Sequence, residues 1–355
     1  MANSETTPPG PSDPGQFSLR RRSVALPTLI SVSLAVVFIA FLLTRFDIDL
    51  GESWRQVRAS TPGFLALAVV LYYLTFPLRG LRWRILLRNA NVYGDRPRVP
   101  SVLEHSSLVV ISWFANSVTW FRLGDAYRAF LLSSRWQLSF SRTAGTMLAE
   151  RGLDIAVVAA LLLAAGIGLL QGDTATRAGA VIVAASALAV LALVALLAMR
   201  LYGLRIARLL PQRMQAAYQR FQEGTLGSFR RLPLLVLVSA LIWFLEAGRL
   251  YFVIKALGLE ISLAMVLFAA LAHSLLTTIP VTPGGLGFVE AGLTGLLVLV
   301  LPREDAATIT LLDRSITYAS ILAVGGLVFA VRQWFEAHRR ASGPIEKPAR
   351  PALPG

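Results

Sequence analysis

The sequence predicts an all-helical integral membrane protein that crosses the bilayer several times. Hydrophobic residues make up 55% of the 355 residues, and the mean hydropathy is +0.62. Charged residues make up only 15%, whereas a soluble chain is usually about 25% charged. Several apolar runs reach the roughly 20 residues that a helix needs to cross a bilayer.

The two ends of the chain differ in composition from the rest. Residues 1–18 are rich in proline and small polar residues, so we expect a disordered tail there. Arg20 to Arg22 precede an apolar run that is too long for a typical signal-peptide core, which predicts an uncleaved first helix. We expect the transmembrane domain over 19–335 and a second disordered tail over 336–355.

About six apolar segments are long enough to be full spans, and two further regions are interrupted. The interrupted regions, 101–133 and 263–301, are each expected to enter and leave the membrane on one side, as a re-entrant hairpin or two short spans. Only then do the arginine-rich segments all fall on the same side. The full spans are predicted over about 24–44, 62–80, 143–170, 178–199, 233–254 and 308–331.

The basic residues indicate orientation. The formal net charge is +14, and nearly all of it comes from arginines at the ends of apolar segments. This is the pattern of cytoplasmic loops, so both termini and the segments 79–98 and 200–231 are predicted to lie on the cytoplasmic side of the cell membrane. Arg79 to Arg88 are expected to form a short amphipathic helix among the lipid headgroups. Nucleic acid is excluded as a partner, and anionic membrane lipids fit the charge.

The residues needed for several other functions are missing or scattered. The chain has no cysteine, and its three histidines are far apart with no zinc-type spacing. No phosphate-loop pattern is present. We therefore expect no metal site, no cofactor and no complete catalytic constellation.

The segment from Pro280 to Glu290 reads Pro-Val-Thr-Pro-Gly-Gly-Leu-Gly-Phe-Val-Glu, between two long apolar runs. Proline removes a backbone donor and glycine weakens a helix, so a broken helix is predicted at membrane depth. Broken helices beside a carboxylate often mark substrate sites. A plain loop between two membrane helices is the alternative.

A weak internal repeat links the two interrupted regions. Leu123-Gly124 can be laid on Leu286-Gly287, which lie 163 residues further along the chain. Three full spans are predicted between the two regions, so the second would enter from the opposite face, as in inverted-repeat transporters. A match of two residues is short, and it is the position of the two Leu-Gly pairs in the predicted topology that suggests an inverted repeat.

Two groups of charged residues stand near or inside apolar segments. In the first interrupted region, Arg122, Asp125 and Arg128 follow one another at intervals of three, which on a helix would place them on one face. Glu150, Arg151 and Asp154 lie within an apolar span, where charges must be paired or face a cavity. Charges at a membrane surface are the alternative for both groups. Glu246 with Arg249, and Asp313 with Arg314, are interpreted as ion pairs that join helices.

These motifs together resemble the lysylphosphatidylglycerol synthase transmembrane family. The resemblance covers roughly residues 24–335, and Trp120 stands where family members often have proline. It implies the flippase-like membrane half of that family, without an aminoacyl-transferase domain. The residues that carry it are Arg79-x-x-Arg82-Trp83, Asn116, Arg122-x-Gly124-Asp125-x-x-Arg128, Glu150-Arg151-x-x-Asp154, Pro280-x-x-Pro283-Gly284-Gly285-x-Gly287-x-x-Glu290 and Arg314-x-x-x-Tyr318.

The function hypothesis is a lipid translocase that moves a polar or charged lipid headgroup, with the two hairpins meeting near the midplane. The alternatives are a membrane transferase that uses a lipid-linked donor, and a non-catalytic partner of a separate lipid-modifying synthase; a homo-oligomer also fits. The expected substrate-binding residues are Arg122, Asp125, Arg128, Glu150, Arg151, Asp154, Pro280, Pro283, Gly284, Gly285, Gly287, Glu290 and Arg314.

Overall fold

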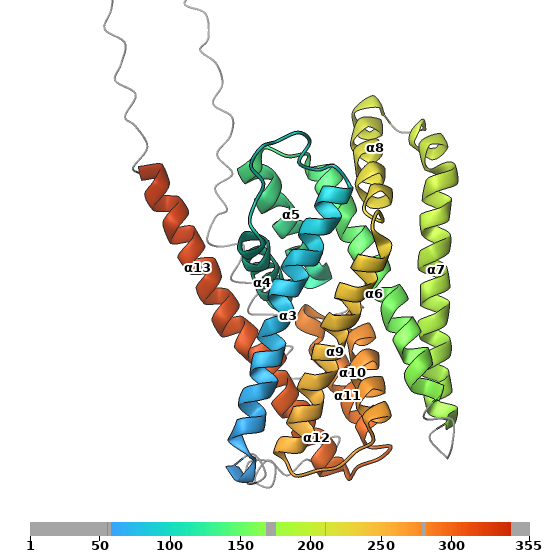
Figure 1. Ribbon diagram of the computed structural model, residues 1–355, viewed down its shortest axis with the longest axis vertical. Helices are drawn as coiled ribbons and strands as arrows, with labels where there is room; N and C mark the ends of the chain where they lie inside the picture. Colours follow the sequence, from blue (N-terminus) through green and yellow to red (C-terminus); the bar gives the residue numbers. More distant parts are fainter. Residues whose placement is uncertain (1–54, 56–57, 168–174, 210, 279–281, 342–355) are drawn as a thin grey trace, which may run out of the picture.

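The computed structural model describes residues 55, 58–167, 175–209, 211–278 and 282–341. This part of the chain is helical throughout (Figure 1), and the predicted class, an all-helical polytopic membrane protein, is confirmed. The span expected over about 24–44, the N-terminal tail and Pro280 lie outside the described residues.

The helices follow one another with short connections. In chain order they are α3 (Pro62–Asn89), α4 (Val102–Val118), η1 (Trp120–Arg122), α5 (Leu123–Trp136), α6 (Phe140–Ile167), α7 (Ala175–Ala207), α8 (Gln212–Gly227), α9 (Leu232–Ala256), α10 (Leu263–Thr278), η2 (Pro283–Gly285), α11 (Phe288–Leu297), α12 (Arg303–Arg314), η3 (Ser315–Ala319) and α13 (Ser320–Ala341). The element η3 is a turn of π-helix, and η1 and η2 are 3₁₀ turns.

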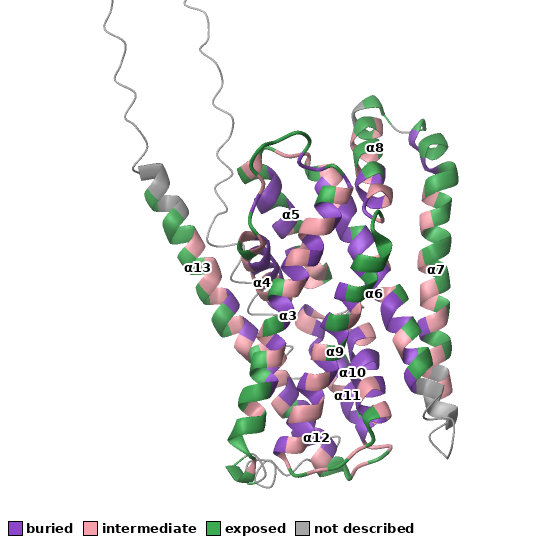
Figure 2. Cartoon of the chain, viewed as in Figure 1, coloured by how far each residue is buried: buried purple, intermediate pink, exposed green. Residues whose placement is uncertain are grey.

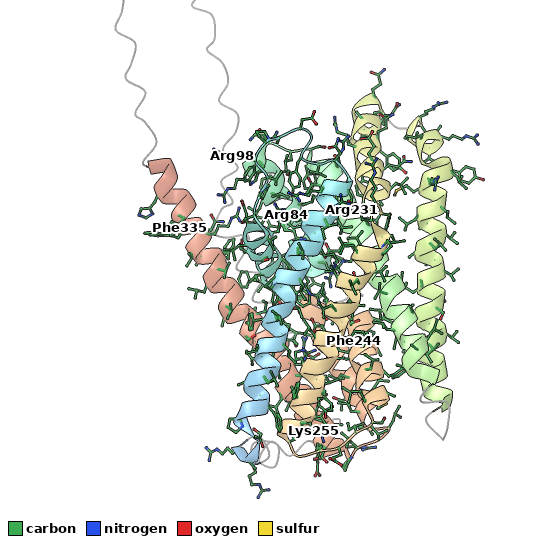
Figure 3. All side chains as sticks on the ribbon, viewed as in Figure 1. Arg84, Arg98, Arg231, Phe244, Lys255 and Phe335 are labelled. Atoms are coloured by element: carbon green, nitrogen blue, oxygen red, sulfur yellow. The ribbon has the colours of Figure 1, made fainter. Side chains whose placement is uncertain are left out.

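The bundle has one arginine-rich end. Arg84, Arg98 and Arg231 lie toward it, and Lys255 lies toward the other end (Figure 3). The last turn of α3, the helix α8 and the end of α7 are also at this end (Figure 1). We call it the arginine-rich end and the other the opposite end.

Among the described residues, four helices are long and apolar enough to span a membrane: Pro62–Asn89, Val181–Ala207, Leu232–Ala256 and Arg303–Phe335. The helix α6 is as long as α3, with 28 residues, and at about 1.5 Å per residue it also has the length to span. It differs from the four because Glu150, Arg151 and Asp154 interrupt its apolar sequence.

Two helical hairpins enter the bundle from opposite ends. The helices α4 and α5 occupy the half at the arginine-rich end, whereas α10 and α11 occupy the other half (Figure 1). The turn of the first hairpin is η1 and the turn of the second is η2, and these two turns contact each other. Both interrupted regions of the sequence are therefore hairpins whose tips meet inside the bundle.

The predicted headgroup helix at Arg79 to Arg88 is wrong. The helix α3 continues unbroken from Pro62 to Asn89, through the predicted end of its span at residue 80. Arg79 and Arg82 are buried, with 2% and 0% of their surface exposed. They are drawn inward because three carboxylates on other helices need cationic partners, and a buried unpaired carboxylate is costly.

The central helices α3 and α9 pack antiparallel. The backbone N–H of Thr61 donates to the carbonyl of Ala256 at 2.8 Å, so the start of α3 meets the end of α9. Tyr72, Phe76 and Trp83 of α3 belong to the larger hydrophobic core. By contrast, α7 lies at the edge of the bundle and is largely exposed (Figure 2), as expected for a helix that faces lipid.

The helices α6 and α8 approach each other closely at two glycines. A Cβ atom at Gly145 would lie 2.1 Å from the carbonyl oxygen of Phe221, and one at Gly224 would lie 2.1 Å from that of Arg142. Real contacts are never this short, so the pairing requires glycine on both helices.

We expect Gly224→Ala to lower the thermal unfolding temperature of the purified protein, because overpacking costs about 1–3 kcal/mol. The matched control is Gly295→Ala in α11, where a Cβ would meet nothing within 4 Å. That substitution should leave stability unchanged or raise it slightly, since alanine favours a helix over glycine. Equal melting temperatures for the two variants would contradict the close packing of α6 on α8.

Candidate functional site

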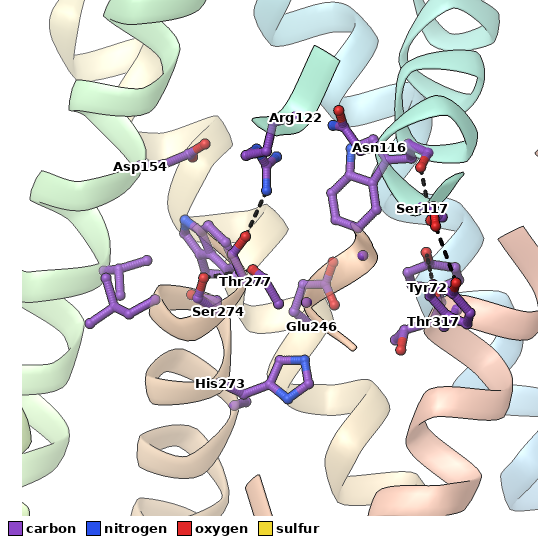
Figure 4. A pocket seen from close by; sticks show the side chains of 18 of the residues that line it. Tyr72, Asn116, Ser117, Arg122, Asp154, Glu246, His273, Ser274, Thr277 and Thr317 are labelled. Carbon is purple, nitrogen blue, oxygen red and sulfur yellow. Dashed lines mark hydrogen bonds between the residues drawn. The ribbon is translucent and has the colours of Figure 1, made fainter. Parts of the chain in front are cut away.

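A polar cavity of about 100 Å³ lies where the two hairpin tips meet. Its wall is built from α3, α4, α6, α9, α10, both hairpin turns and the π-helical segment (Figure 4). Arg122 points into it from the first tip, and His273 and Ser274 line it from α10. Such a polar space inside a membrane bundle is the usual place for a substrate pathway.

The cavity wall is rich in arginine. Two carboxylates, Asp154 and Glu246, line it together with five arginines. The arginines are Arg79, Arg122, Arg151, Arg249 and Arg314. Four of the five pair with carboxylates at the wall or behind it, and Arg151 lies 3.8–4.0 Å from its nearest carboxylate oxygens. A cavity lined by arginines suits an anionic ligand, because the guanidinium fork matches a phosphate or carboxylate.

One ion-pair network lies between the cavity and the arginine-rich end. Arg82 of α3 donates to Asp154 at 2.5 Å, to Glu150 at 3.0 Å and to Ser239 at 2.9 Å. The second oxygen of Glu150 accepts from Arg128 at 2.6 Å. All four charged side chains are buried.

Arg128 does not share a site with Arg122, contrary to the sequence-based interpretation. The guanidinium of Arg128 lies over the ring of Trp83, 4.7 Å from its centre, and does not line the cavity. Arg122 precedes the first residue of α5, so the helical spacing that would place both on one face does not apply. Arg128 instead lies outside the cavity wall, where it binds and orients Glu150.

A second network joins α3, α9 and α12. Arg79 donates to Glu246 at 2.9 Å, and Arg249 donates to the other oxygen of Glu246 at 3.2 Å. Arg249 also pairs with Asp313. The guanidinium of Arg79 lies 4.8 Å from the ring centre of Trp113. The network connects both halves of the bundle through buried charges.

The tip of the first hairpin has an unusual backbone. Phe121 and Arg122 both have positive φ angles, 57° and 53°, which favour glycine. This turn directs the side chain of Arg122 across the cavity, where it donates to the carbonyl of Thr277 at 2.7 Å (Figure 4). Asp125 accepts from Ser112 at 2.9 Å and from Arg122 at 3.4 Å. The first tip is thereby fastened to the second hairpin.

The tip of the second hairpin depends on glycine. Gly284 has φ of 60°, and a Cβ there would lie 2.4 Å from the ring of Tyr318. Glu290 accepts a hydrogen bond from the backbone N–H of Gly287 at 2.5 Å and one from Arg314 at 2.6 Å. Arg314 also donates to the carbonyl of Gly284 at 2.9 Å. Arg314 and Glu290 together hold the turn in its shape.

Several side chains that line the cavity have a buried polar atom without a hydrogen-bond partner among the described residues, and Arg151, Trp243 and His273 are among them. Arg151 makes no side-chain hydrogen bond there, and its nearest carboxylate oxygens are 3.8–4.0 Å away. Trp243 and His273 are buried, and neither the Nε1 of Trp243 nor the Nδ1 of His273 has a partner. Buried polar atoms without partners are rare in proteins, so these atoms are candidates to bind a ligand.

The structure separates the expected binding residues into two groups. Six line the cavity: Arg122, Arg151, Asp154, Gly284, Gly285 and Arg314. Six others do not line it, namely Asp125, Arg128, Glu150, Pro283, Gly287 and Glu290. Pro280 lies outside the described residues.

Sequence reasoning missed several residues of the cavity wall. The sequence-based prediction places Arg79 in the headgroup layer and assigns no binding role to Trp243 or His273. Arg79 could not be placed from the sequence because its partner, Glu246, is 167 residues away in the chain. The sequence did contain a signal for such a partner. Three of the predicted spans carry carboxylates, and a buried carboxylate needs a cation nearby.

The comparisons agree with this architecture. The sequence profile described as the lysylphosphatidylglycerol synthase TM region matches residues 28–325. The chain belongs to this family.

Several relatives of this chain are membrane proteins of archaea. A UPF0104 membrane protein of Methanocaldococcus jannaschii is 30% identical over 61% of this chain and 94% of its own. Another, from Methanothermobacter thermautotrophicus, is 27% identical over 83% of this chain and 93% of its own. The glycosyltransferase AglD of Haloferax volcanii is 25% identical, and the match covers 88% of this chain but 55% of AglD.

Within the family region, the two hairpin turns have matching backbones. Thr119 has φ and ψ of −119° and 153°, and Thr282, which is 163 residues further on, has −135° and 155°. Each threonine is followed by a 3₁₀ turn, Trp120–Arg122 or Pro283–Gly285, with positive φ in the middle. The correspondence covers the four residues from Thr119 to Arg122 and from Thr282 to Gly285, and it supports an inverted repeat.

The same interval of 163 residues relates the charged pairs. Glu150-Arg151 of α6 corresponds to Asp313-Arg314 of α12. Each acid binds an arginine of a central helix: Glu150 binds Arg82, and Asp313 binds Arg249. The adjacent arginines each face an acid of the hairpin on their own side, because Arg151 lies near Asp125 and Arg314 binds Glu290.

We expect Arg82→Met to destabilise the protein severely, because breaking a buried ion pair costs about 3–5 kcal/mol. Thermal unfolding in detergent measures the effect. Arg88→Met is the matched control, since Arg88 lies on the same helix and is exposed.

The double variant Arg82→Met/Asp154→Asn should recover part of the loss, because it removes one of the two carboxylates left without Arg82. Purely additive effects of the two substitutions would show that the pair is not coupled.

Proposed function

We propose that this protein is a lipid translocase that moves a polar or charged lipid headgroup across the membrane. One observation carries the proposal: a cavity lined by five arginines lies between two hairpins that enter from opposite ends. In transporters with inverted repeats, the substrate site lies at the repeat interface, and movement of one repeat against the other opens it to alternate sides.

The cavity suits a headgroup that contains phosphate. Arg151 is the leading candidate for the phosphate, because its ion pairs are long, at 3.8–4.0 Å, and its Nε has no hydrogen-bond partner among the described residues. Trp243 Nε1 supplies a further buried donor. Asp154 and Glu246 line the same space and suit an amino or hydroxyl group of the headgroup.

The cavity is small relative to a whole phospholipid. At about 100 Å³ it accommodates part of a headgroup, and the acyl chains would remain in the bilayer. Arg122 at the first hairpin tip donates to the carbonyl of Thr277 in α10. Tyr318 in η3 donates to the carbonyl of Ser117 in α4 at 3.1 Å. A lipid can enter when either contact opens, so this structure suits a closed state of the transport cycle.

The arginine-rich end is proposed to face the cytoplasm, with both termini on that side of the cytoplasmic membrane. The positive-inside rule supports this orientation. The first hairpin then enters from the cytoplasmic side and the second from the outside.

The similarity to a glycosyltransferase supports a second candidate, a role with lipid-linked sugars. The match covers 55% of that protein, so its activity does not transfer to this chain. A polyprenyl-phosphate sugar carries the same phosphate group as a phospholipid, and we include it as a second substrate in the test.

We expect wild-type protein in liposomes to exchange fluorescent phosphatidylglycerol, or a polyprenyl-phosphate sugar, between leaflets. Dithionite quenching of the outer leaflet measures the exchange. Arg151→Gln should slow it at least tenfold, because the donors for the phosphate are lost while the closer ion pairs of Arg82 with Glu150 and Asp154 remain.

The matched control is Arg220→Gln on α8, which is exposed and far from the cavity wall. It should exchange lipid at the wild-type rate. Full activity of Arg151→Gln would show that the cavity does not bind the headgroup that is moved. If the folded wild-type protein exchanges none of these lipids, a transferase or a partner of a separate synthase becomes the better explanation.

A further inference from the structure

A second hollow lies on the opposite face of α6 from the central cavity. Its volume is about 660 Å³, within the range of about 300–1,000 Å³ that small-molecule sites occupy. Leu153 and Val157 of α6 line it, whereas Asp154 and Val158 line the central cavity. The two spaces are thus separated by the helix itself.

The walls of this lateral groove are apolar along nearly their full length. The helix α6 contributes Gly152, Ala156 and Ala160, and α7 contributes small and branched residues such as Ala189 and Leu193. The first turns of α9 form the third side. Small residues on α6 and α7 leave the space open, while the surrounding leucines keep it hydrophobic.

One charged residue, Arg200 of α7, is part of the described wall of this groove. It lies near the arginine-rich end of α7, and no described side chain forms an ion pair with it. Leu232, which lines the groove on α9, directly follows Arg230 and Arg231. Arg200 is therefore the one cation that the described wall of the groove provides.

The length of the groove corresponds to one leaflet. From Ala189 to Arg200 the helix α7 rises about 16 Å at 1.5 Å per residue. This is about half of the roughly 30 Å hydrocarbon core of a bilayer. A groove of this length can hold an acyl chain of a single leaflet.

We propose that this groove is a binding site for an anionic phospholipid of the leaflet at the arginine-rich end. An acyl chain lies between α6, α7 and α9, and the phosphate contacts Arg200. The apolar walls, the length of one leaflet and the cation at headgroup depth together fit this ligand. The site stands apart from the proposed translocation cavity, and a lipid there joins α7 to the rest of the bundle.

Native mass spectrometry of the purified full-length protein tests the site. The protein is equilibrated with equal amounts of phosphatidylglycerol and phosphatidylcholine in detergent, and the bound lipids are counted. We expect phosphatidylglycerol to be at least threefold enriched. Arg200→Gln should reduce the enrichment to about the bulk ratio, and Ala192→Phe, which fills the groove, should remove the bound lipid.

Two substitutions on the same helix serve as matched controls. Arg205→Gln removes a nearby exposed charge outside the groove, and Leu191→Phe enlarges an exposed residue outside it. Neither should change lipid binding. Enrichment that survives Arg200→Gln, or that Arg205→Gln reduces equally, would overturn the proposal.

The central cavity is the other place where a phospholipid could be held. Arg151→Gln distinguishes the two sites, because it should leave the enrichment unchanged if the lipid lies in the groove. Enrichment lost with Arg151→Gln but kept with Arg200→Gln would place the lipid in the central cavity and overturn the groove site. Equal binding of phosphatidylcholine by the wild-type protein would exclude a preference for anionic lipid.

Discussion

The pairing of buried charge is the constraint on which the rest of this bundle depends. Arg82, Arg128, Glu150, Glu246, Asp313 and their partners lie inside helices that must cross hydrocarbon, where an isolated charge is expensive. Each ion pair therefore fixes one helix against another. Glu150 joins α6 to α3 and α5, and Arg249 joins α9 to α12. Some members of these pairs, Arg79, Asp154, Glu246 and Arg249, also line the central cavity.

The sequence predicted the membrane class and the return of each interrupted region to its own side, because these depend on local and additive features. Apolar runs measure the spans, and the distribution of arginines requires each interrupted region to return to its own side. Arg79 and Arg82 were assigned to the headgroup layer for the same reason: the rule that sets topology treats arginine as a surface residue. Their carboxylate partners are 167 and 68 residues away in the chain, and helix packing alone brings them together.

The candidate site was predicted in part. Arg151 and Gly284 could be selected because a charge within a span and a proline-glycine break are each visible in a short window. Trp243 and His273 could not, because an aromatic or a single histidine in a membrane helix usually belongs to the core. The equal spacing of Glu150-Arg151 and Asp313-Arg314 was available in the sequence, but it becomes meaningful only when both pairs are seen to contact equivalent helices.

The two hairpin turns follow the same path with different residues, and this has an energetic consequence. Gly284 and Gly285 adopt positive φ without cost, whereas Phe121 and Arg122 do so at about 1–2 kcal/mol per residue. A movement that releases the first turn from this geometry therefore gains energy for which the second turn has no counterpart. The two turns therefore have similar backbones but different conformational energies. A difference of about 1.4 kcal/mol corresponds to a tenfold ratio of populations, so strain of this size in one turn is enough to bias an equilibrium between two conformations of the hairpins.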